Sequence, residues 1–205
     1  MSAIKLYTNA LSPNGQKVSL LLDLLKVKYI SQSIDILKGE QKQPWYLKIN
    51  PNGKVPALED VDANGNKKVV FESAAILHYL ANSYDTKRQF SYGLDDPLYY
   101  QELEWTLFSI SGFEGARTTQ FLQYFLVPEK DQKVLDAAST QVETAFSVFE
   151  TQLKKNGNGF LVGDHISIAD IDAYPWVSCA GLPFDGEKFP VLKGWVEKIG
   201  AYKSS

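Results

Sequence analysis

The spacing of apolar residues predicts a strand, a helix and a second strand at the start of the chain. Apolar and polar residues alternate over 4–8, as in a half-buried strand. Apolar residues then recur at helical intervals, which predicts a helix from about residue 13 to residue 26. Alternation returns over 29–36, where three isoleucines share one face: Ile30, Ile34 and Ile36. A strand, helix and strand of these lengths form a right-handed crossover with parallel strands.

A helical turn, a hairpin and a helix are predicted next. Residues 44–47 are typical of a short helical turn. Strands over 55–60 and 67–71 flank Asn64-Gly65, a pair that favours a hairpin turn. The following helix has three inward-facing residues: Ile76, Leu77 and Leu80. The order strand, helix, strand, helical turn, strand, strand, helix is that of the thioredoxin-like fold.

Helical spacing continues through the rest of the chain. Asp96 followed by Pro97 is typical of a helix start, because the aspartate can cap the helix and the proline suits its first position. Gly112 and Gly115 are expected to bend or divide that helix. A second long helix is predicted from about residue 129 to residue 155.

These elements predict two domains. Residues 1–84 are expected to form an α/β domain of the thioredoxin-like fold. Residues 85–94 are polar and mixed, and are the predicted linker. Residues 95–205 are expected to form an all-α helical bundle. Ser167 and Asp170 fit a capping box at one of its helix starts, so both are assigned to structure and not to a site.

Composition narrows the class of protein. A net charge of −3 argues against nucleic acid as a partner. No apolar stretch is long enough to span a membrane, and the first residues do not resemble a signal peptide, so a cytoplasmic protein is expected. The single cysteine, Cys179, cannot form an internal disulfide, and the isolated His78 and His165 do not suggest a metal site. Any thiol chemistry would therefore use a thiol from a bound ligand.

Two short segments have the chemistry to bind a peptide-like ligand. In Val55-Pro56, the proline can turn the Val55 N–H and C=O away from the sheet, although Pro56 also suits an ordinary strand start. Glu72 and Ser73 stand at the start of an apolar helix, whose N–H groups and dipole favour a carboxylate. The Glu72 carboxylate can also bind an ammonium group. Together they predict a zwitterionic, peptide-like ligand.

The start of the first helix can activate a thiol. A free thiol with a pKa of about 8.5 is only a few per cent ionised at neutral pH. The Ser12 hydroxyl, the Asn14 amide and the helix N-terminus can each stabilise a thiolate. Ser12 is equally well explained as a helix cap. Asn14 favours a function more strongly, because asparagine is a poor helix former.

These segments carry a family resemblance. Gly-Lys-Val-Pro-Ala-Leu at 53–58 and Glu-Ser-Ala-Ala-Ile-Leu at 72–77 resemble the glutathione-binding half of the glutathione S-transferases. With Ser-Pro-Asn-Gly at 12–15, the chain is most similar to the branch that holds bacterial nu-class enzymes and a fungal nitrogen-catabolite regulator. The resemblance covers nearly all of the chain. It implies the glutathione S-transferase fold, glutathione as co-substrate without a metal, and a homodimer.

The resemblance also implies roles for single residues. Ser12 and Asn14 match positions at the glutathione sulfur and are the predicted catalytic residues. Five residues match the rest of the glutathione site, with Val55 acting through its backbone: Gln41, Lys54, Val55, Glu72 and Ser73. Several other transferase classes use a tyrosine at the end of the first strand, which makes Tyr7 a competing assignment. The five-residue gap from Tyr7 to Ser12 is similar to the arrangement that uses serine.

The second substrate is less well defined. In similar proteins it meets a wall formed by the segment that holds six aromatic or polar residues here: Trp105, Phe108, Phe113, Arg117, Gln120 and Tyr124. Such a stripe is more often core than pocket, so none is predicted as a site residue. Glu114 and Arg117 depart from the small and apolar residues that the resemblance leads us to expect.

The predicted function is a glutathione S-transferase in detoxification. Bound glutathione would be activated as a thiolate that attacks an electrophilic small molecule. The same thiolate could attack a disulfide or a peroxide, so a glutathione-dependent disulfide reductase or peroxidase is one alternative. A non-catalytic regulatory or interaction protein with the same fold is the other.

Overall fold

The computed structural model describes residues 3–62 and 64–202. The chain divides into two compact units, Met1–Arg88 and Gln89–Ser205, and the predicted linker at 85–94 spans the division. Each unit has a core of its own. In the described part of the chain, no helix has both the length and the apolar character needed to cross a membrane.

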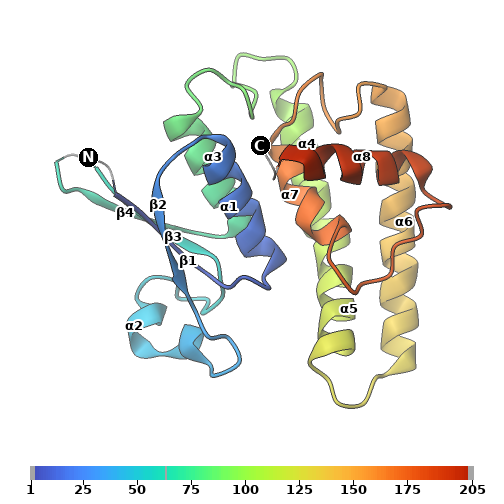
Figure 1. Ribbon diagram of the computed structural model, residues 1–205, viewed down its shortest axis with the longest axis horizontal. Helices are drawn as coiled ribbons and strands as arrows, with labels where there is room; N and C mark the ends of the chain where they lie inside the picture. Colours follow the sequence, from blue (N-terminus) through green and yellow to red (C-terminus); the bar gives the residue numbers. More distant parts are fainter. Residues whose placement is uncertain (1–2, 63, 203–205) are drawn as a thin grey trace. The chain divides into compact units, whose positions relative to one another are not determined.

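A four-stranded sheet forms the centre of the first unit (Figure 1). Its strands are β1 (Ala3–Thr8), β2 (Tyr29–Ser33), β3 (Ala57–Val61) and β4 (Lys67–Phe71). They lie in the order β2-β1-β3-β4. β1 pairs in parallel with β2 and antiparallel with β3, which forms an antiparallel hairpin with β4. The predicted parallel pair and hairpin are confirmed.

Two helices cover one face of this sheet. α1 (Pro13–Leu24) packs against α3 (Ser73–Tyr84) (Figure 1). Seven apolar side chains from these helices and the sheet are almost completely buried: Leu6, Leu21, Leu22, Leu58, Ile76, Leu77 and Leu80. Burying a side chain of this kind stabilises the fold by about 1.5 to 3 kcal/mol.

The other face of the sheet is covered mainly at one end. There α2 (Pro44–Leu47) buries Tyr46 in a small cluster with Tyr7, Ile34 and Ala57. This arrangement explains why β2 differs from the prediction. Ile30 pairs with Lys5 beyond the reach of the cluster and is 64% exposed. β2 also ends at Ser33, so Ile34 and Ile36 lie past the strand that was predicted to include them.

The second unit is helical. Its elements are α4 (Tyr99–Phe108), the π-helix η2 (Ser109–Glu114), α5 (Gly115–Phe125), α6 (Gln132–Asn156), α7 (Ile168–Val177) and α8 (Pro190–Ala201). α6 packs along α5, and α7 contacts α4, η2 and α8. Every residue of α7 is buried, as expected of a helix at the centre of a bundle. An α/β unit followed by an all-α unit confirms the predicted fold class.

Two predictions about the first long helix had different outcomes. The predicted bend is confirmed, because the π-helix η2 contains Gly112 and separates α4 from α5. The predicted start at Asp96 is wrong, since α4 begins at Tyr99. Asp96 instead closes a turn before the helix. Its carboxylate accepts a hydrogen bond from the Leu98 N–H at 2.8 Å, and its carbonyl accepts one from the Tyr99 N–H at 3.1 Å.

The predicted capping box at α7 is confirmed and has a further structural role. Asp170 accepts hydrogen bonds from the Ser167 N–H and hydroxyl at 3.1 and 3.2 Å. The Leu161 N–H at 2.9 Å and the Trp195 indole N–H at 2.7 Å also donate to this carboxylate. Complete burial raises the pKa of Asp170, and these four donors oppose that shift. One side chain therefore joins the start of α7 to the preceding loop and to α8.

Glu150 joins α6 to α8 in a similar way. It is 6% exposed, and its two oxygens accept from the Val191 N–H at 3.3 Å and the Leu192 N–H at 2.7 Å, in the first turn of α8. Lys154 lies 3.0 Å from the same carboxylate. Burial raises the pKa of Glu150, but the hydrogen-bond donors and Lys154 lower it by more. The pKa of Glu150 therefore lies below its ordinary value of 4.5.

We predict that Glu150→Gln destabilises the fold by about 1 to 3 kcal/mol, because a carboxylate at a helix N-terminus is replaced by a neutral amide. Since folding lowers the pKa of Glu150, its contribution is complete above pH 4.5 and is lost as the pH falls through the folded-state pKa. Urea unfolding should show a lower free energy of unfolding than wild type at pH 7. The difference should be much smaller at a pH below the folded-state pKa of Glu150. A difference that does not depend on pH would contradict this assignment.

Candidate functional site

The register of the sheet brings distant parts of the first unit to one edge. Tyr7 on β1 pairs with Ala57 on β3, and Ala57 pairs with Phe71 on β4. β3 runs antiparallel to both neighbours, so the ends of β1 and β4 lie beside its start. Predicted site residues follow β1, precede β3 and follow β4. The segments that hold them therefore all lie at this edge of the sheet.

α1 begins close to the end of β1. Ser12 is its N-cap, and the Ser12 hydroxyl oxygen accepts from the Gly15 N–H at 3.2 Å. A side chain at Gly15 would place its Cβ 2.0 Å from the Thr8 hydroxyl oxygen, so only glycine permits this approach. Asn14 lies half-buried in the first turn. The capping role of Ser12 uses only a lone pair of its oxygen, so its O–H can still donate to a ligand.

Tyr7 has a different arrangement. Its hydroxyl donates to the Glu59 carboxylate at 2.9 Å, and only 4% of the residue is exposed. Burial and the bond to Glu59 raise the pKa of Tyr7 to about 12, so the phenol is neutral at physiological pH. Lys67 forms an ion pair with the other Glu59 oxygen. The Tyr7 proton is therefore directed along the sheet to Glu59 and not toward the start of α1.

Hydrogen bonds from buried side chains hold the backbone just before β3. The Lys54 carbonyl oxygen accepts from the Tyr46 hydroxyl at 2.8 Å and from the Asn50 amide at 2.7 Å. Val55 packs against the cluster that contains Tyr46, and the Val55-Pro56 bond is cis. The side chain of Lys54 is exposed. Sheet pairing begins at Ala57, two residues beyond Val55.

Gln41 lies beside this segment, in the short helix η1 (Glu40–Lys42). Its amide nitrogen donates to the Ile36 carbonyl at 3.2 Å, and its amide oxygen is buried without a hydrogen-bond partner among the described residues. Gly53 has a φ of 59°, and a Cβ there would lie 2.9 Å from the Gln41 carbonyl oxygen. Gln41 therefore contacts the loop that leads into Lys54.

Glu72 has an unusual backbone at the start of α3. Its φ of 70° and ψ of 120° lie in a region that residues with a side chain rarely occupy. Its exposed carboxylate accepts from the Asn52 amide at 3.4 Å. Ser73, the first residue of α3, is 9% exposed. Backbone strain of this kind is concentrated at functional sites.

Three residues that the sequence analysis did not select connect the predicted ones. Tyr46 and Asn50 hold the Lys54 carbonyl, and Asn52 links Glu72 to the same loop. The Asn-Pro-Asn-Gly sequence at 50–53 was the available signal, because asparagine side chains commonly bond to the backbone of turns. Tyr46 gave no comparable signal, since its partner lies eight residues away.

In the second unit, Arg117 belongs to the core. It is fully buried and donates to the carbonyls of Trp176 at 3.0 Å, Val177 at 3.1 Å and Pro183 at 3.0 Å. Burial lowers the pKa of Arg117 to about 10, which leaves it charged at neutral pH. A cation at the last carbonyls of α7 complements the helix dipole. This contact explains why an arginine replaces the small or apolar residue expected from the resemblance.

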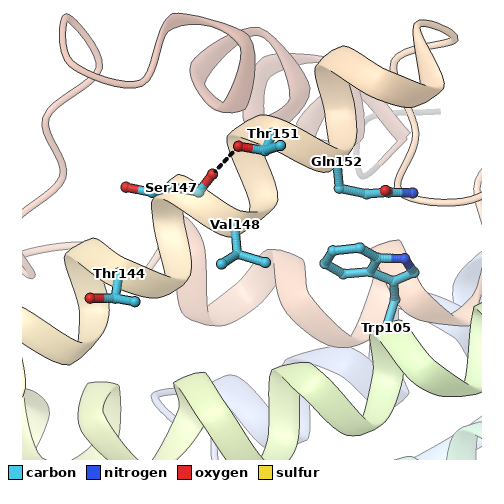
Figure 2. Close-up of a pocket in the computed structure, with 6 residues that line it drawn as sticks. All are labelled: Trp105, Thr144, Ser147, Val148, Thr151 and Gln152. Atoms are coloured by element: carbon cyan, nitrogen blue, oxygen red, sulfur yellow. Dashed lines mark hydrogen bonds between the residues drawn. The ribbon is translucent and has the colours of Figure 1, made fainter.

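A shallow groove of about 410 Å³ lies between α4 and α6 (Figure 2). Its lining residues are Trp105, Thr144, Ser147, Val148, Thr151 and Gln152. The three hydroxyls donate to carbonyls four residues earlier in α6, at 2.8 to 3.0 Å. Of the six residues considered for the second substrate, Trp105 lines this groove, whereas Phe113, Arg117 and Gln120 are at most 1% exposed.

Cys179 is the single cysteine of the chain. Burial raises the pKa of the half-buried Cys179, with Arg117 opposing the shift, so its thiol is mostly protonated at neutral pH. Across residues 3–62 and 64–202, no group of three or more His, Cys, Asp or Glu side chains is placed to hold a metal ion.

Comparison with known proteins identifies the family. Residues 11–83 match the model described as "Glutathione S-transferase, N-terminal domain", and residues 105–201 match "Glutathione S-transferase, C-terminal domain". Glutathione S-transferase 2 of Schizosaccharomyces pombe is 36% identical over 190 residues, which is 92% of this chain and 80% of that protein. The chain belongs to the glutathione S-transferase family.

Two further proteins are similar to this chain over most of its length. Disulfide-bond oxidoreductase YfcG of Escherichia coli is 28% identical over 197 residues, covering 92% of this chain and 86% of its own. The glutathione transferase URE2P6 of Phanerochaete chrysosporium, solved in complex with oxidized glutathione, is 33% identical with a TM-score of 0.89. That match covers 98% of this chain and 94% of the solved one. The predicted family and fold are confirmed, and these relatives agree with the predicted branch.

We predict that the strained backbone of this glutathione S-transferase chain is relieved by glycine. Glu72→Gly and Glu72→Ala both remove the carboxylate, but only glycine adopts a φ of 70° freely, so Glu72→Gly should be more stable by about 1 kcal/mol in urea unfolding. Ala75→Gly, at an exposed helical position, should instead lose about 1 kcal/mol. Equal stability of the two Glu72 variants would show that the site is not strained.

Proposed function

We propose that this protein is a glutathione transferase. In this proposal the first unit binds glutathione, lowers the pKa of its thiol, and directs the thiolate at an electrophilic carbon of a small molecule. The observation that carries it is the convergence of the α1 N-terminus, the Lys54–Val55 segment and the Glu72–Ser73 helix start at one edge of the sheet. A tripeptide needs recognition at both ends and at its centre, and these three segments offer it.

The tripeptide would be bound through its charges and its backbone. The exposed Glu72 carboxylate suits the ammonium of the γ-glutamyl residue, and the N–H groups at Ser73 suit its carboxylate. Lys54 and Gln41 are assigned to the glycyl carboxylate, since the Lys54 side chain is exposed and cationic. Val55 lies between these ends along the chain, so its N–H and C=O would pair with the cysteinyl backbone.

Thiol activation is assigned to Ser12 and Asn14. Each unit by which the thiol pKa falls requires about 1.4 kcal/mol of preferential binding of the thiolate. A hydrogen bond to a charged group contributes roughly 1.5 to 3 kcal/mol, so two donors at a helix N-terminus suffice for a shift of two units. Such a shift would make most of the bound thiol ionised at neutral pH.

A glutathione-dependent disulfide reductase or peroxidase is the second candidate. The similarity to the Escherichia coli disulfide-bond oxidoreductase favours it. With a single cysteine in the chain, glutathione would supply the attacking sulfur in either reaction. Parallel assays with a halogenated aromatic compound, a mixed disulfide and a hydroperoxide separate the candidates. Glutathione binding without turnover of any of them would favour a non-catalytic protein.

We also infer the oligomeric state, the cellular location and the domain limits of the protein. A homodimer and a cytoplasmic role in detoxification are inferred from the family. The domain limits of 1–84 and 95–205, joined by residues 85–94, are part of the same inference. Light scattering on the purified protein tests the dimer directly.

We predict that Glu72→Ala combined with Ser73→Ala abolishes retention on immobilised glutathione, because the γ-glutamyl end loses its ammonium partner and a polar contact at the helix start. The fold should remain intact by circular dichroism. Glu187→Ala combined with Ser147→Ala removes the same two groups from exposed positions in the second unit and serves as the control. Normal retention of the first double variant would refute the γ-glutamyl site.

We predict that Asn14→Ala raises the pKa of bound glutathione by about one unit, since a donor to the thiolate is lost. Thiolate absorbance measured against pH follows this shift, and activity near neutral pH should fall accordingly. Tyr7→Phe should leave the titration unchanged, because the Tyr7 hydroxyl donates to Glu59. The opposite pattern, with a shift in Tyr7→Phe only, would reassign the activating role to Tyr7.

A further inference from the structure

The carbonyl oxygen of Lys54 is bound by two buried side chains. The Tyr46 hydroxyl donates to it at 2.8 Å and the Asn50 amide at 2.7 Å. Tyr46 is fully buried and Asn50 is 2% exposed. A carbonyl oxygen has two lone pairs, so these donors occupy both of them and fix the direction of the C=O bond.

This carbonyl also sets the direction of the neighbouring N–H. The Lys54 C=O and the Val55 N–H belong to the same peptide unit, which is trans. In a planar trans peptide these two bonds point in opposite directions. Because the Lys54 oxygen points toward Tyr46 and Asn50, the Val55 N–H must point away from them.

The two donors are themselves held in place. The Tyr46 ring packs edge-on against Tyr7, with ring centres 6.0 Å apart, and against Trp45 at 5.5 Å. The Asn50 amide oxygen accepts from the Asn52 N–H at 3.0 Å, which fixes the orientation of its amide. The peptide unit before Val55 is therefore positioned by side chains that cannot easily reorient.

We infer that Tyr46 and Asn50 are positioning residues that direct the Val55 N–H at the cysteinyl carbonyl of glutathione. The inference rests on the proposed function, which assigns the glutathione backbone to Val55. Neither side chain is required to touch the ligand, since both act through the peptide unit of Lys54 and Val55. A donor that is already oriented loses less conformational freedom on binding, so the effect falls on affinity and not on thiol ionisation.

Tyr46→Phe tests this directly, because it removes one hydroxyl and keeps the ring. Glutathione should bind about three- to tenfold more weakly by calorimetry, as expected for the loss of one hydrogen bond. The pKa of the bound thiol should not change. Tyr7→Phe is the matched control, since it removes a buried hydroxyl from the same cluster that bonds to Glu59 instead. Its glutathione affinity should equal that of wild type.

A glutathione analogue distinguishes a misdirected Val55 N–H from a general loss of rigidity in the binding site. A thioamide at the cysteinyl–glycine bond replaces the carbonyl oxygen by sulfur, a weaker acceptor, and should weaken binding to wild type. In Tyr46→Phe the same replacement should cost less, because the Val55 N–H is no longer well directed. The inference is overturned if Tyr46→Phe binds glutathione normally, if both tyrosine variants lose affinity equally, or if the thioamide penalty is unchanged. Failure of wild type to bind glutathione would instead overturn the proposed function itself.

Discussion

Backbone pairing among β1, β3 and β4 is the constraint on which the first unit depends. The paired row of Tyr7, Ala57 and Phe71 joins segments that are separated by up to 64 residues, from 7 to 71, and brings their ends to one edge. A shift of this register by one residue would turn each inward side chain to the opposite face. The buried clusters on both faces oppose such a shift, so the cores on the two sides of the sheet also maintain the site.

Three buried charged residues of the second unit bind helix ends, each with the sign that its end favours. The carboxylates of Asp170 and Glu150 bind N–H groups at the starts of α7 and α8, and the Arg117 guanidinium binds carbonyls at the end of α7. A helix N-terminus attracts negative charge and a C-terminus attracts positive charge. Each of these three buried side chains therefore has its polar atoms bound by backbone groups, and each connects elements that are distant in the sequence.

Local patterns predicted most of the fold and part of the candidate site. The α1 start at Ser12, the capping box at Ser167 and the helices with 3.6-residue periodicity depend on neighbours in the sequence, and they were found. The structural role of Arg117 was not, because the carbonyls to which it donates lie 59 to 66 residues away. Tyr46 was missed because its partner, the Lys54 carbonyl, lies eight residues away and no local motif marks the contact. The roles of the seven selected site residues remain predictions, although their segments converge at one edge of the sheet.

Gly15 has a consequence for the placement of the first turn of α1. Because a side chain here would collide with Thr8, the close approach of α1 to β1 at this point requires glycine. Ser12 caps this same turn through its hydroxyl oxygen, and Asn14 stands within it. A side chain at Gly15 would therefore push the start of α1 away from β1 and move both of these residues with it.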